Sequence, residues 1–133
     1  MKEAAMFRAR TDDMDYRAVF GWYLELEGKP TIVTEDGEYI SVKKTTLDRW
    51  TRLYDKDGTP IYSGDIIRID GDCAFYQVSD DWKMFHVISI GINWGIEVLA
   101  IELEEDKIKV IGNQYSLTAN DVIEMERKES EVA

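Results

Sequence analysis

Residues 46–70 read T-L-D-R-W-T-R-L-Y-D-K-D-G-T-P-I-Y-S-G-D-I-I-R-I-D, and this stretch carries the clearest fold signal of the chain. Apolar residues before and after the sequence D-K-D-G, residues 55–58, are typical of two strands joined by a tight turn. Gly58 can take the positive φ that closes a type I turn with a bulge. Gly64 and Asp65 resemble the turn into a strand of small barrels, where the carboxylate accepts hydrogen bonds from turn amides. The stretch predicts β structure, with a turn-stabilising rather than a catalytic role for Asp65.

The residues before this stretch predict an antiparallel meander. Residues 7–10 are expected as a short first strand, and residues 16–26 as a long one whose even positions form a markedly more apolar face. Gly21 is a candidate β-bulge in that strand. Strands are also expected over residues 31–34, which are β-branched throughout, and over residues 38–42. The loops between these strands are too short for parallel crossovers, so the strands should be antiparallel.

The residues after this stretch predict further strands. Residues 73–78 begin one strand, and the run 84–92, M-F-H-V-I-S-I-G-I, is apolar at almost every position, as in a strand that is buried on both faces. Residues 96–103 and 108–111 are expected to form a hairpin with its tip at residues 104–107.

The C-terminal residues predict a short helix and a tail. Asn120 is the expected N-cap of a helix that begins there, and the charged residues 126–133 are expected to be a frayed, mobile tail.

Composition limits the class of protein. The chain has 133 residues and a mass of 15.4 kDa, the size of one domain, and 44% hydrophobic residues exclude a disordered chain. No apolar run approaches the roughly 20 residues of a membrane helix. Cys73 is the only cysteine and no apolar segment opens the chain, so a cytoplasmic location is expected. The net charge of −11 opposes binding to a phosphate backbone.

Three motifs resemble those of the YopX family, small proteins carried by bacteriophages and prophages. The longest is T-L-x-x-W-T-x-L-x-D-K-D-G-x-x-I-Y-x-G-D-I-I, over residues 46–67. Residues 6–9, M-F-R-A, resemble the opening motif K-F-R-A-W, and residues 110–115, V-I-G-N-Q-Y, resemble the closing motif V-I-G-N-I-Y-E-N. The resemblance spans nearly the whole chain and implies a YopX-like fold.

The chain departs from this family pattern at three positions. Arg52 stands where the family usually has Gly, Ser63 where it usually has Glu, and Arg10 where Trp is common. We expect these departures to leave the fold intact. Any role that the family's glutamate has at position 63 is in doubt for this chain. The family has no established catalytic or binding residues, so the resemblance implies origin and fold rather than an activity.

A local basic and aromatic cluster is the candidate site for nucleic acid or for a partner. Its charge is +3 over ten residues in an otherwise acidic chain, and aromatic rings beside cations can stack on single-stranded bases. Core packing is the alternative for its tryptophan, since aromatic residues dominate buried area. Burial of that ring would argue against base stacking. The cluster consists of Lys43, Lys44, Arg49, Trp50, Arg52 and Tyr54.

Catalytic and metal motifs are absent from the sequence. D-K-D-G does not continue as a calcium loop, because positions six and twelve counted from Asp55 are Pro60 and Ile66. Cys73 and His86 are the only candidates for a catalytic dyad, but the residues around Cys73 match no signature of a cysteine nucleophile. The same two residues cannot complete a zinc site of nitrogen and sulfur ligands. We therefore expect no catalytic residues, no cofactor and no metal.

The sequence thus predicts a mainly β, β-rich α+β protein. We expect one YopX-like domain over residues 1–133, with an antiparallel N-terminal β lobe (6–45) packed on a small Src-homology-3-like β-barrel (46–125). The expected function is that of a non-enzymatic phage or prophage accessory protein that binds a host or phage protein. The alternative is binding or processing of single-stranded nucleic acid. The apolar run 84–92 also predicts a homo-oligomer, although the N-terminal lobe could cover it instead.

Overall fold

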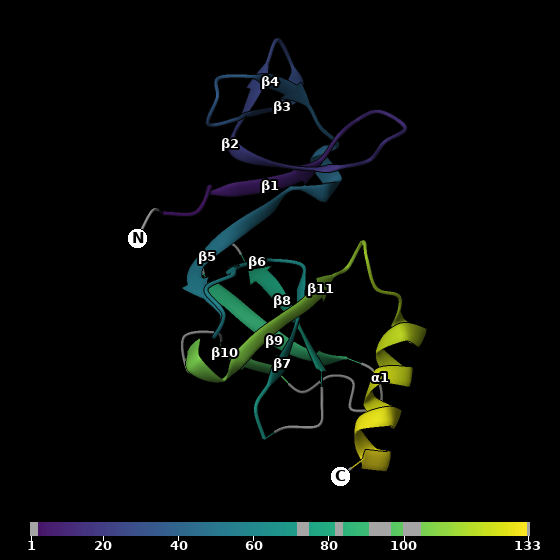
Figure 1. Ribbon diagram of the computed structural model, residues 1–133. Coiled ribbons are helices and arrows are strands. Elements are labelled where there is room, and N and C mark those ends of the chain that lie inside the picture. The colour runs from purple at the N-terminus through teal and green to yellow at the C-terminus, as the bar shows by residue number, and fades with distance from the viewer. Residues whose placement is uncertain (1–2, 72–74, 82–83, 91–96, 100–104, 133) are drawn as a thin grey trace. The chain divides into compact units, whose positions relative to one another are not determined.

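The computed structural model describes residues 3–71, 75–81, 84–90, 97–99 and 105–132 (Figure 1). Within these residues the chain is mainly β, with two antiparallel sheets and one α-helix, α1 (Ala119–Val132). It divides into two compact units, Met1–Trp50 and Thr51–Ala133. The mainly β fold class is confirmed.

Strands β1 to β4 form the sheet of the first unit, each antiparallel to the next. This arrangement confirms the predicted meander. Its core contains Ala9, Val19, Ile32 and Val42, all at most 4% exposed. The strands are β1 (Phe7–Arg10), β2 (Ala18–Leu26), β3 (Lys29–Val33) and β4 (Tyr39–Ser41).

Gly21 marks the point at which β2 changes its pairing partner. Phe7 of β1 pairs with Gly21, whereas Val33 of β3 pairs with Trp22. A Cβ atom at Gly21 would lie 2.1 Å from the carbonyl oxygen of Val33, so only glycine fits there. One ladder ends at Gly21 and the other begins at Trp22, so Gly21 allows a close backbone approach at this junction, and the predicted bulge stays a prediction.

Strand β5 (Asp48–Tyr54) follows the short 3-10 helix η1 (Lys44–Thr46) and contains the boundary between the two units. It pairs with β1, where Arg8 lies opposite Asp48. The Nη2 atom of Arg8 donates to Oδ2 of Asp48 at 2.9 Å, and both side chains are buried. Because removing one partner would leave an uncompensated buried charge, this ion pair fixes the register of β1 against β5.

The second unit is built on a five-stranded sheet in the order β10-β9-β8-β7-β11. Strand β6 (Pro60–Tyr62) instead lies next to β5, at the end of the order β4-β3-β2-β1-β5-β6. The five strands are β7 (Asp65–Ile69), β8 (Phe75–Asp81), β9 (Met84–Ile90), β10 (Glu97–Leu99) and β11 (Ile108–Asn113), the last preceded by η4 (Glu105–Lys107).

Alternation along β7 divides the core of this unit between the two faces of the sheet. Ile67 belongs to a buried cluster that includes Ile61 of β6. Ile66 packs instead with Phe75 and with Val122 of α1, the helix that Figure 1 shows beside the sheet. Leu53 and Ile61 therefore pack on one face of the five-stranded sheet, and Val122 of α1 packs on the other.

The predicted small barrel is not confirmed. No pairing joins β10 to β11 among the described residues, so these two strands remain the edges of an open sheet. Strand β10 pairs with β9, and β11 pairs with β7. The predicted hairpin of residues 96–103 and 108–111 includes residues 96 and 100–104, which lie outside the described residues, so it stays a prediction. Closure of this sheet stays a prediction.

Helix α1 differs from its predicted form at both ends. The Thr118 hydroxyl accepts from the backbone N–H of Asp121 at 3.1 Å, while the Asp121 carboxylate accepts from the backbone N–H of Thr118 at 2.8 Å. This reciprocal pair is a capping box, so Thr118 rather than Asn120 is the N-cap. Residues 126–132, expected as a frayed tail, belong to the helix.

Candidate functional site

The predicted basic and aromatic cluster is divided between the two units. Lys43 and Lys44 are exposed, but both cations have local partners. Nζ of Lys44 donates to Oε1 of Glu25 at 2.8 Å, and Nζ of Lys43 lies 5.3 Å from the ring centroid of Tyr16. The first unit contains Lys43, Lys44, Arg49 and Trp50, and the second contains Arg52 and Tyr54.

Trp50 is a core residue. Its side chain is 5% exposed, and its backbone N–H donates to the carbonyl oxygen of Met6 at 2.8 Å. Base stacking requires an open ring face, which a buried indole does not offer. The burial of Trp50 therefore argues against nucleic-acid binding through this cluster.

Asp55 of the D-K-D-G turn has a structural role. Its Oδ1 accepts from the backbone N–H groups of Asp57 and Thr59, and its Oδ2 accepts from Val110 of β11 at 3.0 Å. Burial acts to raise the pKa of Asp55, but these three donors favour the charged form and hold the pKa below its ordinary value. The carboxylate thus ties the turn to the edge strand β11.

Gly64 and Asp65 join the signature stretch to the closing motif. Oδ2 of Asp65 accepts from the backbone N–H of Tyr62 at 2.8 Å, which confirms its predicted role in the turn. Gly64, with a φ of 83°, accepts from the backbone N–H of Gln114. The motifs quoted for the family resemblance thus meet as a network of turns, and their conspicuous polar residues hold the fold together.

Metal-binding clusters are absent from the part of the chain that the structure describes, where no group of three His, Cys, Asp or Glu side chains could hold an ion. Cys73 lies outside the described residues, and so does the side chain of His86, so the geometry of a dyad is not defined. No helix in the described ranges has the length and apolar character needed to cross a bilayer.

The exposed apolar face of β2 is the main feature that the sequence analysis did not recognise as a site. Phe20, Trp22 and Leu26 are 45%, 59% and 46% exposed, whereas Val19 and Tyr23 face the core. The even positions are the more apolar side of this strand, as the alternation predicted, yet they face outward. Aromatic residues this exposed are typical of interaction surfaces.

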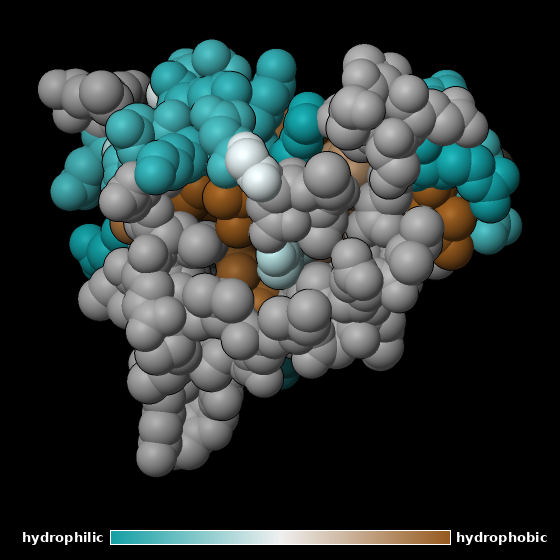
Figure 2. All heavy atoms as spheres, turned by 90° about the horizontal axis from the view of Figure 1, so that it is seen from below, coloured by the Kyte–Doolittle hydropathy of each residue, from teal (hydrophilic) through white to brown (hydrophobic). Residues whose placement is uncertain are grey.

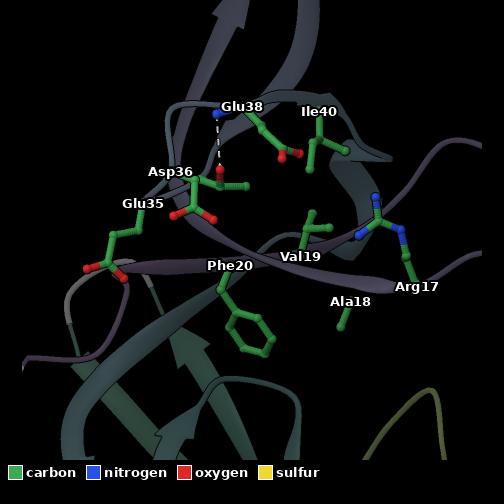
Figure 3. Close-up of a pocket in the computed structure, with 9 residues that line it drawn as sticks. Arg17, Ala18, Val19, Phe20, Glu35, Asp36, Glu38 and Ile40 are labelled. Carbon is green, nitrogen blue, oxygen red and sulfur yellow. Dashed lines mark hydrogen bonds between the residues drawn. The ribbon is translucent and has the colours of Figure 1, made fainter.

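An open pocket of about 350 Å³ lies beside the first half of β2. Figure 3 shows Arg17 and Asp36 at opposite ends of it, with Val19 and Ile40 between them. The β3–β4 turn on one side of the pocket is held by a hydrogen bond from the backbone N–H of Glu38 to the Thr34 hydroxyl. Carboxylates outnumber the single guanidinium in its lining, which therefore favours a cation.

Hydrophilic residues form part of the remaining surface. On the face that Figure 2 draws, described residues of this kind lie at the upper left and at the right, with hydrophobic ones visible between them. This distribution accords with the excess of acidic over basic residues, 27 against 16.

These features define a small, acidic, β-rich protein whose recognisable motifs stabilise turns and strand edges. The family model described as YopX protein matches residues 6–118, which is most of the chain, and the chain belongs to this family. A comparison with curated proteins found no match.

Proposed function

We propose that this YopX-family protein is a non-enzymatic binding module for another protein. The observation that carries the proposal is the outward-facing apolar side of β2, in particular Trp22 and Leu26, which no described residue covers enough to bury. Exposed aromatic and apolar side chains on a hydrogen-bonded sheet give a rigid contact surface at little cost in conformational entropy.

The proposed partner is a protein of the bacterial host or of the phage, and the proposed site of action is the host cytosol. The phage association of the family supports this origin. The buried Trp50 and the net charge of −11 make a nucleic acid the less favourable partner. The conspicuous carboxylates of Asp55 and Asp65 are engaged in holding turns, which supports a binding rather than a catalytic role.

Affinity capture from host lysate, with and without phage infection, tests the proposal. The bait is the full chain, compared with Trp22→Ser and with Met14→Ser as a control, because Met14 is fully exposed in the loop between β1 and β2 and does not belong to β2. We expect a protein that is retained by the wild type and by Met14→Ser but lost with Trp22→Ser. Direct binding of the purified pair should show the same order. Equal capture by all three baits would contradict the proposal.

A further inference from the structure

We propose that the β2–β4 meander docks a basic segment of its partner that also carries apolar side chains. This inference rests on the proposed protein-binding function and adds the chemistry of the partner. Three observations carry it: an exposed apolar row across the sheet, an excess of carboxylates that lie mostly in the turns joining the same strands, and the pocket beside the β3–β4 turn.

The apolar row runs across three strands. Trp22 pairs with Val33, and Val33 pairs with Tyr39, so their side chains lie on one face of the sheet. Trp22 is 59% exposed and Tyr39 67% exposed. The ring of Phe7 meets the indole edge-on at a centroid distance of 5.6 Å, which orients Trp22 before any partner arrives.

The β2–β4 meander, residues 18–42, is acidic, whereas the rest of the first unit is slightly basic. Residues 18–42 contain five Asp or Glu and a single Lys, a net charge of −4. The other residues of Met1–Trp50 contain seven Lys or Arg and five Asp or Glu, a net charge of +2. Lys44 pairs with Glu25, but the carboxylates of the β3–β4 turn lie next to Tyr39 of the row, and electrostatic complementarity there selects a basic partner.

The pocket provides a place for one cationic side chain. Among the described residues, the carboxylates of Asp36 and Glu38 have neither a hydrogen-bond nor an ion-pair partner, and both line the pocket. Half-buried Ile40 offers an apolar contact for the aliphatic stem of a lysine or arginine. Ile40 points to the opposite side of β4 from Tyr39, so the docked segment would pass round β4, the edge strand of the sheet. The volume of about 350 Å³ is at the small end of ligand pockets and suits a single side chain.

Two other occupants fit less well. A nucleic acid would bring phosphates against the net charge of −4 of the meander. A second copy of this chain would bring the same acidic surface against itself across a twofold contact, which places like charges opposite one another. A basic segment has neither conflict.

Calorimetric titration of the full chain with three matched synthetic peptides tests the proposal. In the first peptide arginine and leucine alternate, in the second glutamate replaces arginine, and in the third serine replaces leucine. We expect the arginine–leucine peptide to bind at least about tenfold more tightly than either of the others, because only it offers both charge and apolar contact. Its affinity should fall as salt is added.

Matched variants separate the two contributions. Trp22→Ser should remove most of the binding, and Asp36→Asn with Glu38→Gln should weaken it about tenfold and flatten its salt dependence. Met14→Ser and Asp106→Asn are the controls, since both side chains are exposed and lie outside the meander. Circular dichroism of each variant confirms that the fold is retained.

The outcomes distinguish this inference from the proposed function. If a captured partner depends on Trp22 but is unaffected by Asp36→Asn with Glu38→Gln, protein binding stands and the basic chemistry of the partner is wrong. Equal binding of the arginine and glutamate peptides overturns the inference as well. So does a dimer that Trp22→Ser converts to a monomer, because the face would then bind a second copy.

Discussion

Arg52 has a φ of 69°, a conformation that L-residues other than Asn and Asp rarely adopt. It stands where the YopX pattern usually has glycine, and this backbone angle gives a physical reason for that preference. We expect Arg52→Gly to raise the free energy of unfolding by about 0.5–1 kcal/mol, since the relief of strain exceeds the entropic cost of glycine. Urea unfolding measures the difference. Arg52→Ala keeps the strained angle, so an equal gain in that variant would contradict the explanation.

Asp55 should make the stability of the protein depend on pH in the acid range. Its pKa is lowered in the folded state, so its contribution is fully present above the ordinary pKa of about 4 and is lost as the pH falls through the folded-state value. Asp55→Asn removes the charge, and we expect it to lower the free energy of unfolding at neutral pH by about 1–3 kcal/mol.

Urea unfolding of both proteins from neutral pH down to acid pH checks this sign. The difference between wild type and Asp55→Asn should shrink as the pH falls, because the wild-type carboxyl becomes protonated. Asp57→Asn is the control, since Asp57 is exposed and takes part in this network only through its backbone N–H. A difference that stays constant with pH would contradict the role of the charge.

At the scale of the element, β2 depends on the absence of a side chain at Gly21. We expect Gly21→Ala to lower the free energy of unfolding by about 2 kcal/mol or more, because the new Cβ would meet the carbonyl oxygen of Val33. Gly37→Ala is the comparison: it has open space but a φ of 86°, so a loss of about 1 kcal/mol is expected. Equal losses in thermal or urea unfolding would show that the close approach is not the limiting feature.

Helix α1 depends on the capping box at its start. Thr118→Ala should destabilise the helix by about 1 kcal/mol, because the backbone N–H of Asp121 loses its acceptor. Val122 packs against Ile66 and Phe75, so this loss should reach the core of the second unit. Thr118→Ser retains the hydroxyl and should restore stability in unfolding followed by far-ultraviolet circular dichroism. A serine variant as unstable as the alanine variant would contradict the cap.

The sequence predicted those elements whose signals are local. The strand at residues 7–10, the turn at Gly58 and the role of Asp65 each follow from a few neighbouring residues, and the structure agrees with them. Strand partners are not local properties. Strand β11 pairs with β7, far away in the sequence, and turn residues alone do not indicate this pairing.

The candidate binding sites also depend on contacts between residues that are distant in the sequence. Alternation along residues 18–26 identified the apolar face of the strand, but it could not show that the opposite face packs against Ala9 and Ile32. The cluster around Trp50 meets a related limit, since proximity in sequence does not place side chains on one surface. A tryptophan beside cations is more often core than contact, and Trp50 is core.

At the scale of the whole molecule, charge is unevenly distributed along the chain. Thr51–Ala133 contains eight Lys or Arg and 17 Asp or Glu, a net charge of −9, against −2 for Met1–Trp50. Such an excess of one sign repels a second copy of the chain and is screened by salt. Self-association must therefore overcome this repulsion through apolar contact.

The homo-oligomer predicted from residues 84–92 can be tested by varying the salt concentration, which screens the charge repulsion but leaves the apolar contact. Val87 is buried in the core of the second unit, and the other side chains of this run lie outside those whose burial the structure describes. Strand β10, next to β9, is a sheet edge among the described strands, and edges invite pairing. We expect light scattering to give a mass above the 15.4 kDa of one chain, and the mass should rise with added salt as repulsion is screened. A mass of one chain at every salt concentration would contradict the prediction and leave the apolar run to packing within the chain.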